Sequence, residues 1–425
     1  MDIKRLRRRL TRWDSVDRMP SLRDLTRERW RECWIGPWRA VPVLGVTQII
    51  AWGTIFYSPV LTVPLIVAET GWSLSFTMAG FSLGLLAAGL VSPFVGRSID
   101  RYGGHVVMTA GSLISALGLV GLALAHHPVV YLAIWVVLGA GLGASLYDPA
   151  FATLGRIFGA AARRPITILT LAGGFASTVG WPATHLLIGA VGWRGTYIVY
   201  AVLMAAICAP LHAFALPRGR AAVSAPSGAP AAQAVALLPS NGIAFILVTA
   251  AFTAYAFVPS ALSAHLLAIF GRTGIDAGTV VMIGALFGPA QVMARVTELA
   301  FGRNVHPLLV ARAAVTLLVG AFALLAFMGI SAPLAAAFAL MFGAANGLIT
   351  ITRGALPLAL FGADGYGRLI GRISGPWLVM QSAAPLVMAF VAERASDAVA
   401  LAFAAAFAIA ALACFAAIRR PALPV

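Results

Sequence analysis

Residues 96–104 of the chain read Gly-Arg-Ser-Ile-Asp-Arg-Tyr-Gly-Gly and stand between an apolar run at 75–96 and another at 105–125. Gly96 permits the close approach of a neighbouring helix. Asp100 places a carboxylate at the end of an apolar run, where a helix N-terminus or an arginine can neutralise it. The segment is therefore predicted to be a loop between two helices that contacts another part of the chain.

The composition around this segment is that of a membrane protein. Of the 425 residues, 60% are hydrophobic and 10% are charged, whereas soluble domains contain about 25% charged residues. A helix that crosses a bilayer needs about 20 mostly apolar residues. Twelve such runs are predicted, at 40–68, 75–96, 105–125, 128–157, 165–191, 195–216, 241–270, 277–301, 307–329, 332–361, 368–392 and 396–418.

The twelve runs form two halves of similar length, 40–216 and 241–418. Between them, the segment 217–240 is rich in Pro, Ala and Ser and reads as a flexible cytoplasmic linker. Residues 1–39 form a basic tail before the first run, and 419–425 form a short tail after the last. Glycine motifs recur in the same order in both halves, at Gly139-x-x-x-Gly143 and Gly343-x-x-x-Gly347. The sequence therefore predicts an all-α polytopic membrane protein of two pseudo-symmetric six-helix bundles.

The formal net charge of +16 is explained by membrane topology. In a soluble protein it would indicate nucleic-acid binding. With the N-terminus inside, 24 Lys and Arg residues fall in inside segments, and only Arg194, Arg272 and Arg394 fall in outside loops. Positive residues accumulate on the cytoplasmic side, so both termini are predicted to be cytoplasmic and no nucleic-acid partner is expected. Nucleic-acid binding by residues 1–39 is the alternative.

No cofactor, metal site or enzymatic site is predicted. The three cysteines are isolated from one another and form neither a disulfide framework nor a metal-binding pattern. The sequence contains no Walker motif and no nucleophile–base constellation. The chain is therefore not expected to be an enzyme.

The segment 96–104, the twelve runs and the central linker resemble the major facilitator superfamily over almost the whole chain. The resemblance implies alternating access between two halves, with a substrate cavity between them. It also implies that the aspartate of this motif latches the second helix to the start of the eleventh and to a basic residue that ends the fourth. The positions that match are Gly96, Asp100, Arg101, Arg156, Arg368 and Arg372. The alternative is that these charges only orient the helices.

Gln291, Arg295 and Glu298 share one face of the predicted eighth helix, because their spacings are four and three residues. A charge inside a membrane span costs at least about 2.5–3.5 kcal/mol on insertion scales, so it normally faces a wet cavity or a partner. This helix is similar to the eighth helix of monocarboxylate and oxalate–formate type facilitators. The similarity implies that Arg295 binds the substrate carboxylate, with Gln291 where proton-coupled members have an aspartate. An internal pair between Arg295 and Glu298 is the alternative.

Two contacts between the halves are also predicted. Glu298 stands near the position equivalent to Asp100, which predicts a second latch with Arg163 and Arg164 as its partners; a proton-carrying role is the alternative. Asp148 and Arg353 occupy equivalent positions in the fourth helix of each half and are predicted to form a gate. Pairing of each charge within its own half is the alternative.

The remaining site predictions concern the cavity and the proton. Trp52 and Tyr57 of the first helix are predicted to line the substrate site together with Arg295 and Gln291; packing between helices is the alternative for the two aromatic residues. The candidates for proton coupling are Asp148, Glu298, His185 and His265.

These features together predict a monomeric secondary transporter in the lipid bilayer of the bacterial inner membrane. Its substrate is expected to be a small organic anion with a carboxylate, moved by proton symport or by exchange. The alternatives are export of drug-like or amphipathic compounds and, in another class, a transport-inactive membrane sensor.

Overall fold

A computed structural model describes residues 36–219, 239 and 242–419 of the chain, and within these ranges it is helical with no β-strand. The helices of the first half are η3 (Pro37–Arg39), α3 (Ala40–Ala51), η4 (Trp52–Tyr57), α4 (Pro59–Thr70), α5 (Leu74–Tyr102), α6 (Gly104–Leu124), α7 (Pro128–Ser145), α8 (Tyr147–Phe158), η5 (Gly159–Ala162), α9 (Arg163–Gly173), α10 (Ala176–Leu203), η6 (Met204–Cys208) and η7 (Leu211–Ala215). Those of the second half are α11 (Ile243–Arg272), α12 (Ala277–Phe301), η8 (Gly302–Asn304), α13 (Pro307–Met328), α14 (Ala332–Phe361), α15 (Tyr366–Arg394) and α16 (Asp397–Ala417).

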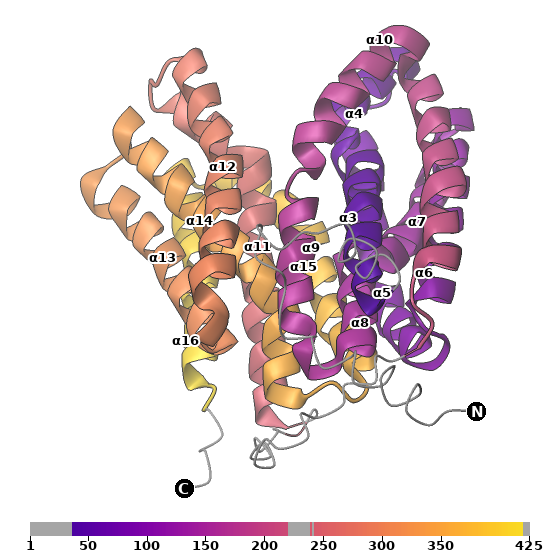
Figure 1. The fold of residues 1–425 in the computed structure, drawn as a ribbon. Helices are drawn as coiled ribbons and strands as arrows, with labels where there is room; N and C mark the ends of the chain where they lie inside the picture. The colour runs from indigo at the N-terminus through magenta and orange to yellow at the C-terminus, as the bar shows by residue number, and fades with distance from the viewer. Residues whose placement is uncertain (1–35, 220–238, 240–241, 420–425) are drawn as a thin grey trace, which may run out of the picture.

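The helices cross a membrane twelve times in the part of the chain that the structure describes. Ten stretches are long and apolar enough to span a bilayer, and one of them, Pro128–Ala215, contains 88 residues. About 20 helical residues cross the hydrocarbon core, so this stretch suffices for several crossings. It turns at two glycines with positive φ, Gly159 (56°) and Gly192 (69°), and α10 arches over at the second of them (Figure 1). The long stretch therefore crosses three times, and the predicted twelve-helix membrane fold is confirmed.

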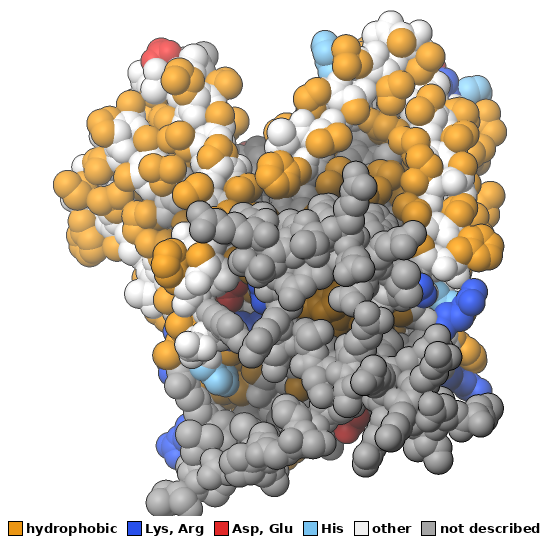
Figure 2. Space-filling model, viewed as in Figure 1, with side chains coloured by type: hydrophobic (Ala, Val, Ile, Leu, Met, Phe, Trp, Pro, Cys, Tyr) orange, Lys and Arg blue, Asp and Glu red, His pale blue; other side chains and the backbone are white. Residues whose placement is uncertain are grey.

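The two halves form two lobes, with α3–α10 in one and α11–α16 in the other (Figure 1). The lobes diverge at the end where α10 arches, and Figure 2 shows the outline hollowed between them there. They meet at the opposite end, where α5 ends at Tyr102 and α15 begins at Tyr366. We call this second end the base. The outer surfaces of the lobes are mostly hydrophobic (Figure 2), as contact with lipid requires.

Matching glycines bring equivalent helices together in both halves. A Cβ on Gly143 of α7 would lie 3.0 Å from the carbonyl oxygen of Ala88 in α5. In the second half, a Cβ on Gly347 of α14 would lie 2.6 Å from the carbonyl oxygen of Gln291 in α12. Only a small residue permits helix backbones to approach so closely. The glycine repeat of the sequence therefore corresponds to a repeated helix pair in the structure.

The predicted loop at 96–104 is wrong for most of its length, because α5 continues to Tyr102 and ends only at Gly103, with φ 89°. Asp100 thus lies on the last turn of a helix. The apolar run ends at Gly96, but the helix extends beyond it as a polar turn, which hydropathy alone reads as a loop. Residues 1–35 of the basic tail, 220–238 and 240–241 of the linker, and 420–425 of the last tail lie outside the described residues.

Candidate functional site

Arg295 of α12 is 4% exposed, and its guanidinium reaches the other half. Nη1 donates a hydrogen bond to the carbonyl oxygen of Thr170 (2.8 Å), and Nη2 donates one to Oε1 of Gln291 (3.0 Å). Nε has no hydrogen-bond partner, and no carboxylate of the described residues lies within 4.0 Å of this side chain. The expected alternative, a pair with Glu298, is not formed. The charge is therefore buried with only neutral acceptors around it.

The end of α9 explains how the first half receives this arginine. The helix ends at Gly173, and a Cβ on Gly174 would lie 2.6 Å from Nη1 of Arg295. The glycine therefore leaves room for the guanidinium beside the last turn. Carbonyl groups at a helix C-terminus carry partial negative charge and favour a cation, so the break between α9 and α10 creates a place for a positive group.

Aromatic side chains of the first half lie close to the same arginine. Trp52 and Tyr57 belong to η4, a π-helical turn, and such turns frequently occur at functional sites. The Trp52 ring lies 6.0 Å from Tyr57 and 4.9 Å from Tyr147, and Tyr57 lies 5.8 Å from Trp181, between ring centroids. Tyr147 lies beside Arg295, because its hydroxyl donates to the same Thr170 carbonyl oxygen (3.4 Å) that accepts from the guanidinium. The structure thus brings Trp52 and Tyr57 together with Arg295.

Gln48 is a site residue that the sequence analysis missed. It is fully buried; its Nε2 donates to the carbonyl oxygen of Ser145 (2.7 Å), and its Oε1 accepts from Nε1 of Trp52 (3.1 Å). Ser145 is the last residue of α7, where a carbonyl group loses its helical partner. Gln48 replaces that partner and at the same time holds the Trp52 indole. The feature of the sequence that could have indicated this role is the amide side chain of Gln48 within an apolar run.

Asp148 of α8 and Arg353 of α14 form an ion pair between the two halves, with Oδ1 and Nη2 2.9 Å apart. Asp148 lies in the first turn of α8, where the helix dipole favours a carboxylate, and the Arg353 guanidinium stacks over the Trp377 ring at 4.6 Å. Both side chains are largely buried, and Oδ1 accepts no hydrogen bond despite the short distance. The contact is therefore mainly electrostatic.

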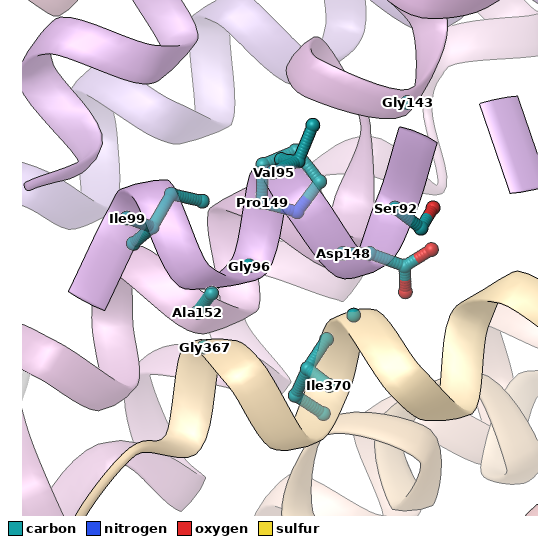
Figure 3. A pocket seen from close by; sticks show the side chains of 11 residues that line it. Ser92, Val95, Gly96, Ile99, Gly143, Asp148, Pro149, Ala152, Gly367 and Ile370 are labelled. Atoms are coloured by element: carbon teal, nitrogen blue, oxygen red, sulfur yellow. The ribbon is translucent and has the colours of Figure 1, made fainter. Parts of the chain in front are cut away.

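A small cavity adjoins the Asp148 carboxylate. Its volume is about 10 Å³, which is close to the space of one water molecule. Figure 3 shows the carboxylate beside Ser92 of α5 and facing the α15 helix that carries Ile370. The gate pair thus lies against the contact between α5 and α15.

Asp100 binds the N-terminus of α15. Its Oδ1 accepts from the backbone N–H of Gly367 (2.9 Å) and its Oδ2 from that of Arg368 (2.7 Å). Arg156 does not bind the carboxylate but donates to the carbonyl oxygens of Ile99 and Asp100. A methyl group on Gly96 would overlap the carbonyl oxygen of Gly367. This contact therefore joins the last turn of α5 to the first turn of α15.

The side chains of Arg372 and Arg101, two residues of the predicted latch, lie over aromatic rings. The guanidinium of Arg372 lies 4.2 Å above the Phe245 ring, because one helical turn beyond Arg368 the side chain faces α11 and not α5. That of Arg101 is exposed and lies over Tyr102. Arg368 contributes its backbone N–H, and its side chain is exposed.

Glu298 forms the equivalent contact on the other side of the base. Its Oε1 lies 2.8 Å from Nη2 of Arg163, and Thr167 Oγ1 donates to its Oε2 (3.2 Å). Arg163 also donates to the carbonyl oxygens of Gly302 and Val305 beyond the end of α12. The Arg164 side chain is exposed at the start of the same helix as Arg163. Both halves thus use an acid near the end of one helix to contact the start of a helix in the other half.

The two histidines lie away from these contacts. His185 is exposed on α10, and Nε2 of His265 lies 3.0 Å from the carbonyl oxygen of Pro385. Neither is bonded to Arg295 or Asp148. Among the residues that the structure describes, no group of three His, Cys, Asp or Glu side chains is arranged to hold a metal ion.

Comparison with known proteins identifies the family and the fold. Residues 43–352 match the model of the Major Facilitator Superfamily, whereas a search of curated protein sequences gave no match. The fold is similar to that of the human organic anion transporter MFSD10 (TETRAN), with a TM-score of 0.68, 16% identity, and coverage of 89% of this chain and 99% of that one.

Two sugar symporters have similar structures. The E. coli fucose:proton symporter FucP (N162A) matches with a TM-score of 0.68 and 14% identity, over 88% of this chain and 97% of that one. The proton:xylose symporter XylE bound to 6-bromo-6-deoxy-D-glucose matches with a TM-score of 0.66 and 11% identity, over 88% and 94%. Family and neighbours are transporters and not enzymes, as the sequence predicted. The chain belongs to the major facilitator superfamily and is a multi-pass membrane transporter of small molecules.

Proposed function

We propose that the chain is a secondary transporter of small organic anions and that Arg295 binds their carboxylate. The observation that carries this proposal is the buried guanidinium of Arg295, which has no carboxylate partner among the described residues. An unpaired buried charge costs several kcal/mol, and a carboxylate would neutralise it through two parallel hydrogen bonds. The similarity to monocarboxylate and oxalate–formate type facilitators and the shared fold of an organic anion transporter support the same substrate class.

The contacts at the base support transport by alternating access. Four contacts join the halves there, through Arg295, Asp148, Glu298 and Asp100. With both termini in the cytoplasm of a bacterial inner membrane, this structure is the outward-facing state. A substrate carboxylate competes with the Thr170 carbonyl for the Arg295 guanidinium, so binding weakens one of the contacts that keep the base closed. The transporter works as a monomer, because the site lies between the halves of one chain.

Asp148 is the group that we propose for proton coupling. Protonation would remove the negative charge of the gate pair and leave Arg353 without its partner. Uptake driven by a proton gradient indicates symport, whereas uptake only into vesicles preloaded with anion indicates exchange.

Thermal stability of the purified protein tests the substrate class. We expect at least one of formate, acetate, oxalate, succinate and benzoate to raise the melting temperature. A ligand at 100 times its Kd adds about 2.7 kcal/mol to the free energy of unfolding. Acetamide and benzamide should not stabilise, because they lack the charge.

The substitution Arg295→Gln should abolish the stabilisation. The control is Arg312→Gln, which removes another arginine of a membrane span; Arg312 donates only to carbonyl oxygens of its own half. Equal stabilisation by acids and amides, or stabilisation by amphipathic cations alone, would contradict the proposal and favour the drug-export alternative.

A further inference from the structure

We propose that the site selects carboxylates whose body is a flat aromatic ring, and that Trp52, Tyr57 and Trp181 create this preference. The inference rests on the proposed function and adds the chemical class of the substrate body. It follows from the different chemistry of the two sides of the site around Arg295.

The first half contributes an aromatic wall. Trp52 and Tyr57 come from η4, Tyr147 from α8 and Trp181 from α10, and each ring lies within 6.0 Å of another, between centroids. Trp52 and Tyr57 are only partly buried, and Trp181 is 44% exposed. These rings therefore have free faces and edges, although they lie between helices.

The second half contributes polar groups. Arg295 Nη2 lies 3.5 Å from Thr350 Oγ1, which itself donates to the carbonyl oxygen of Asn346 (2.7 Å). Gln291 and Asn346 use their amide oxygens as acceptors for Arg295 and Tyr255. Their amide NH2 groups then remain to donate to an anion next to the guanidinium. This side recognises charge and hydrogen-bond acceptors.

The two sides fix the orientation of the substrate. The Tyr147 hydroxyl and Arg295 Nη1 both donate to the carbonyl oxygen of Thr170, and the Tyr147 ring lies 4.9 Å from that of Trp52, so a carboxylate at the guanidinium has its body beside the aromatic wall. Aromatic pairs prefer offset-stacked or edge-to-face geometry at centroid distances of about 4.5–7 Å. A flat ring gains these contacts with Tyr57 and Trp52, whereas a saturated ring of the same size gains only apolar burial.

The Trp52 ring is held in one orientation, which makes the wall selective. Its indole N–H donates to Gln48, which is fixed by the Ser145 carbonyl. Gln48 thus acts as a positioning residue, because it touches the aromatic wall and not the anion site. A wall that is already ordered loses little conformational entropy when the substrate binds.

Calorimetric titration of the full-length protein with benzoate and cyclohexanecarboxylate tests the inference. The two probes have the same charge and similar size but differ in the aromatic ring. We expect wild-type protein to bind benzoate about five- to tenfold more tightly, in line with one to two aromatic contacts. Tyr57→Leu and Trp52→Leu should reduce this ratio to about one, while Tyr57→Phe, which keeps the ring, should retain it.

Trp72→Leu is the matched control, because the Trp72 ring contacts Phe76 and Tyr131 and not the rings of the aromatic wall. It should leave the ratio unchanged. Equal affinities for both probes in wild-type protein, with binding lost in Arg295→Gln, would overturn the aromatic preference but retain the proposed anion site. Binding of neither probe, or binding independent of Arg295, would overturn the proposed function itself.

Discussion

Nη1 of Arg295 in α12 lies 2.8 Å from the carbonyl oxygen of Thr170 in α9, so the proposed substrate anchor of one half is bonded to the main chain of the other. Under the proposed function the same guanidinium has two roles. In the absence of substrate it would contribute to closure of the base, and a carboxylate that binds it would compete with that contact. The proposal thus couples substrate binding and the opening of the base through one side chain.

The contact between α5 and α15 should not tolerate a methyl group at position 96. In Gly96→Ala the new Cβ would overlap the Gly367 carbonyl oxygen, and overpacking costs about 1–3 kcal/mol. We expect the base to open and transport to fall at least tenfold. The reporter is Ile370→Cys, because Ile370 is buried beside this contact. Cys33, Cys208 and Cys414 are replaced by Ser in the same protein. Maleimide should label the new cysteine faster when Gly96→Ala is also present.

Gly189→Ala is the matched control, because nothing lies within 4 Å of a Cβ at that position. It should change neither labelling nor transport. Slow labelling and normal transport in Gly96→Ala would show that closure at this point is not required.

Glu298→Gln should separate the latch from the proton-carrying alternative. The substitution removes the charge from the 2.8 Å pair with Arg163, and hydrogen bonds between charged groups contribute about 1.5–3 kcal/mol. A latch predicts that net uptake and anion exchange both become about tenfold slower. If Glu298 instead carries the proton, exchange persists and only proton-driven net uptake is lost. Glu69→Gln removes an ion pair within the first half and should affect neither.

The Asp148–Arg353 pair should show strong coupling in a double-mutant cycle. Asp148→Asn or Arg353→Gln alone leaves a buried charge without its partner, which costs about 3–5 kcal/mol, so each should lower the melting temperature markedly. The double variant removes both charges and should regain most of that loss. Additive losses would mean that the two residues act through separate partners.

Gln48→Leu should affect both stability and selectivity. It leaves the buried Ser145 carbonyl without a partner, at a cost of about 1–3 kcal/mol, and releases the Trp52 indole. We expect a lower melting temperature and a benzoate-to-cyclohexanecarboxylate affinity ratio near one. Gln381→Leu releases Trp377 in the other half and should leave the ratio unchanged; an equal change in both variants would contradict a specific role of Gln48.

The sequence predicts the helices well because membrane spans follow from one property, the length of an apolar run. Its predictions were least accurate where helices extend beyond the hydrocarbon region. The last turn of α5 is polar through Arg97, Asp100 and Arg101, so hydropathy reads it as a loop. Arg372 follows Arg368 by one turn, yet its guanidinium lies over the ring of Phe245 in α11.

The candidate site could be predicted only in part, because several of its partners are main-chain atoms. The spacing of Gln291 and Arg295 places both on one helix face, but no pattern indicates that the Thr170 carbonyl receives the guanidinium. Gln48 is similar, since its role depends on the carbonyl at the end of α7, 97 residues later in the chain. Such contacts depend on how the halves pack and leave little trace in the residue pattern.

The most direct test is uptake of radiolabelled benzoate and acetate into proteoliposomes that contain wild-type protein, Arg295→Gln or Arg312→Gln. The proposal predicts saturable uptake by wild-type protein and by Arg312→Gln, and uptake at the level of empty liposomes for Arg295→Gln. Uptake by Arg295→Gln at the wild-type rate and with the wild-type KM would contradict the assignment of Arg295 as the residue that binds the transported carboxylate.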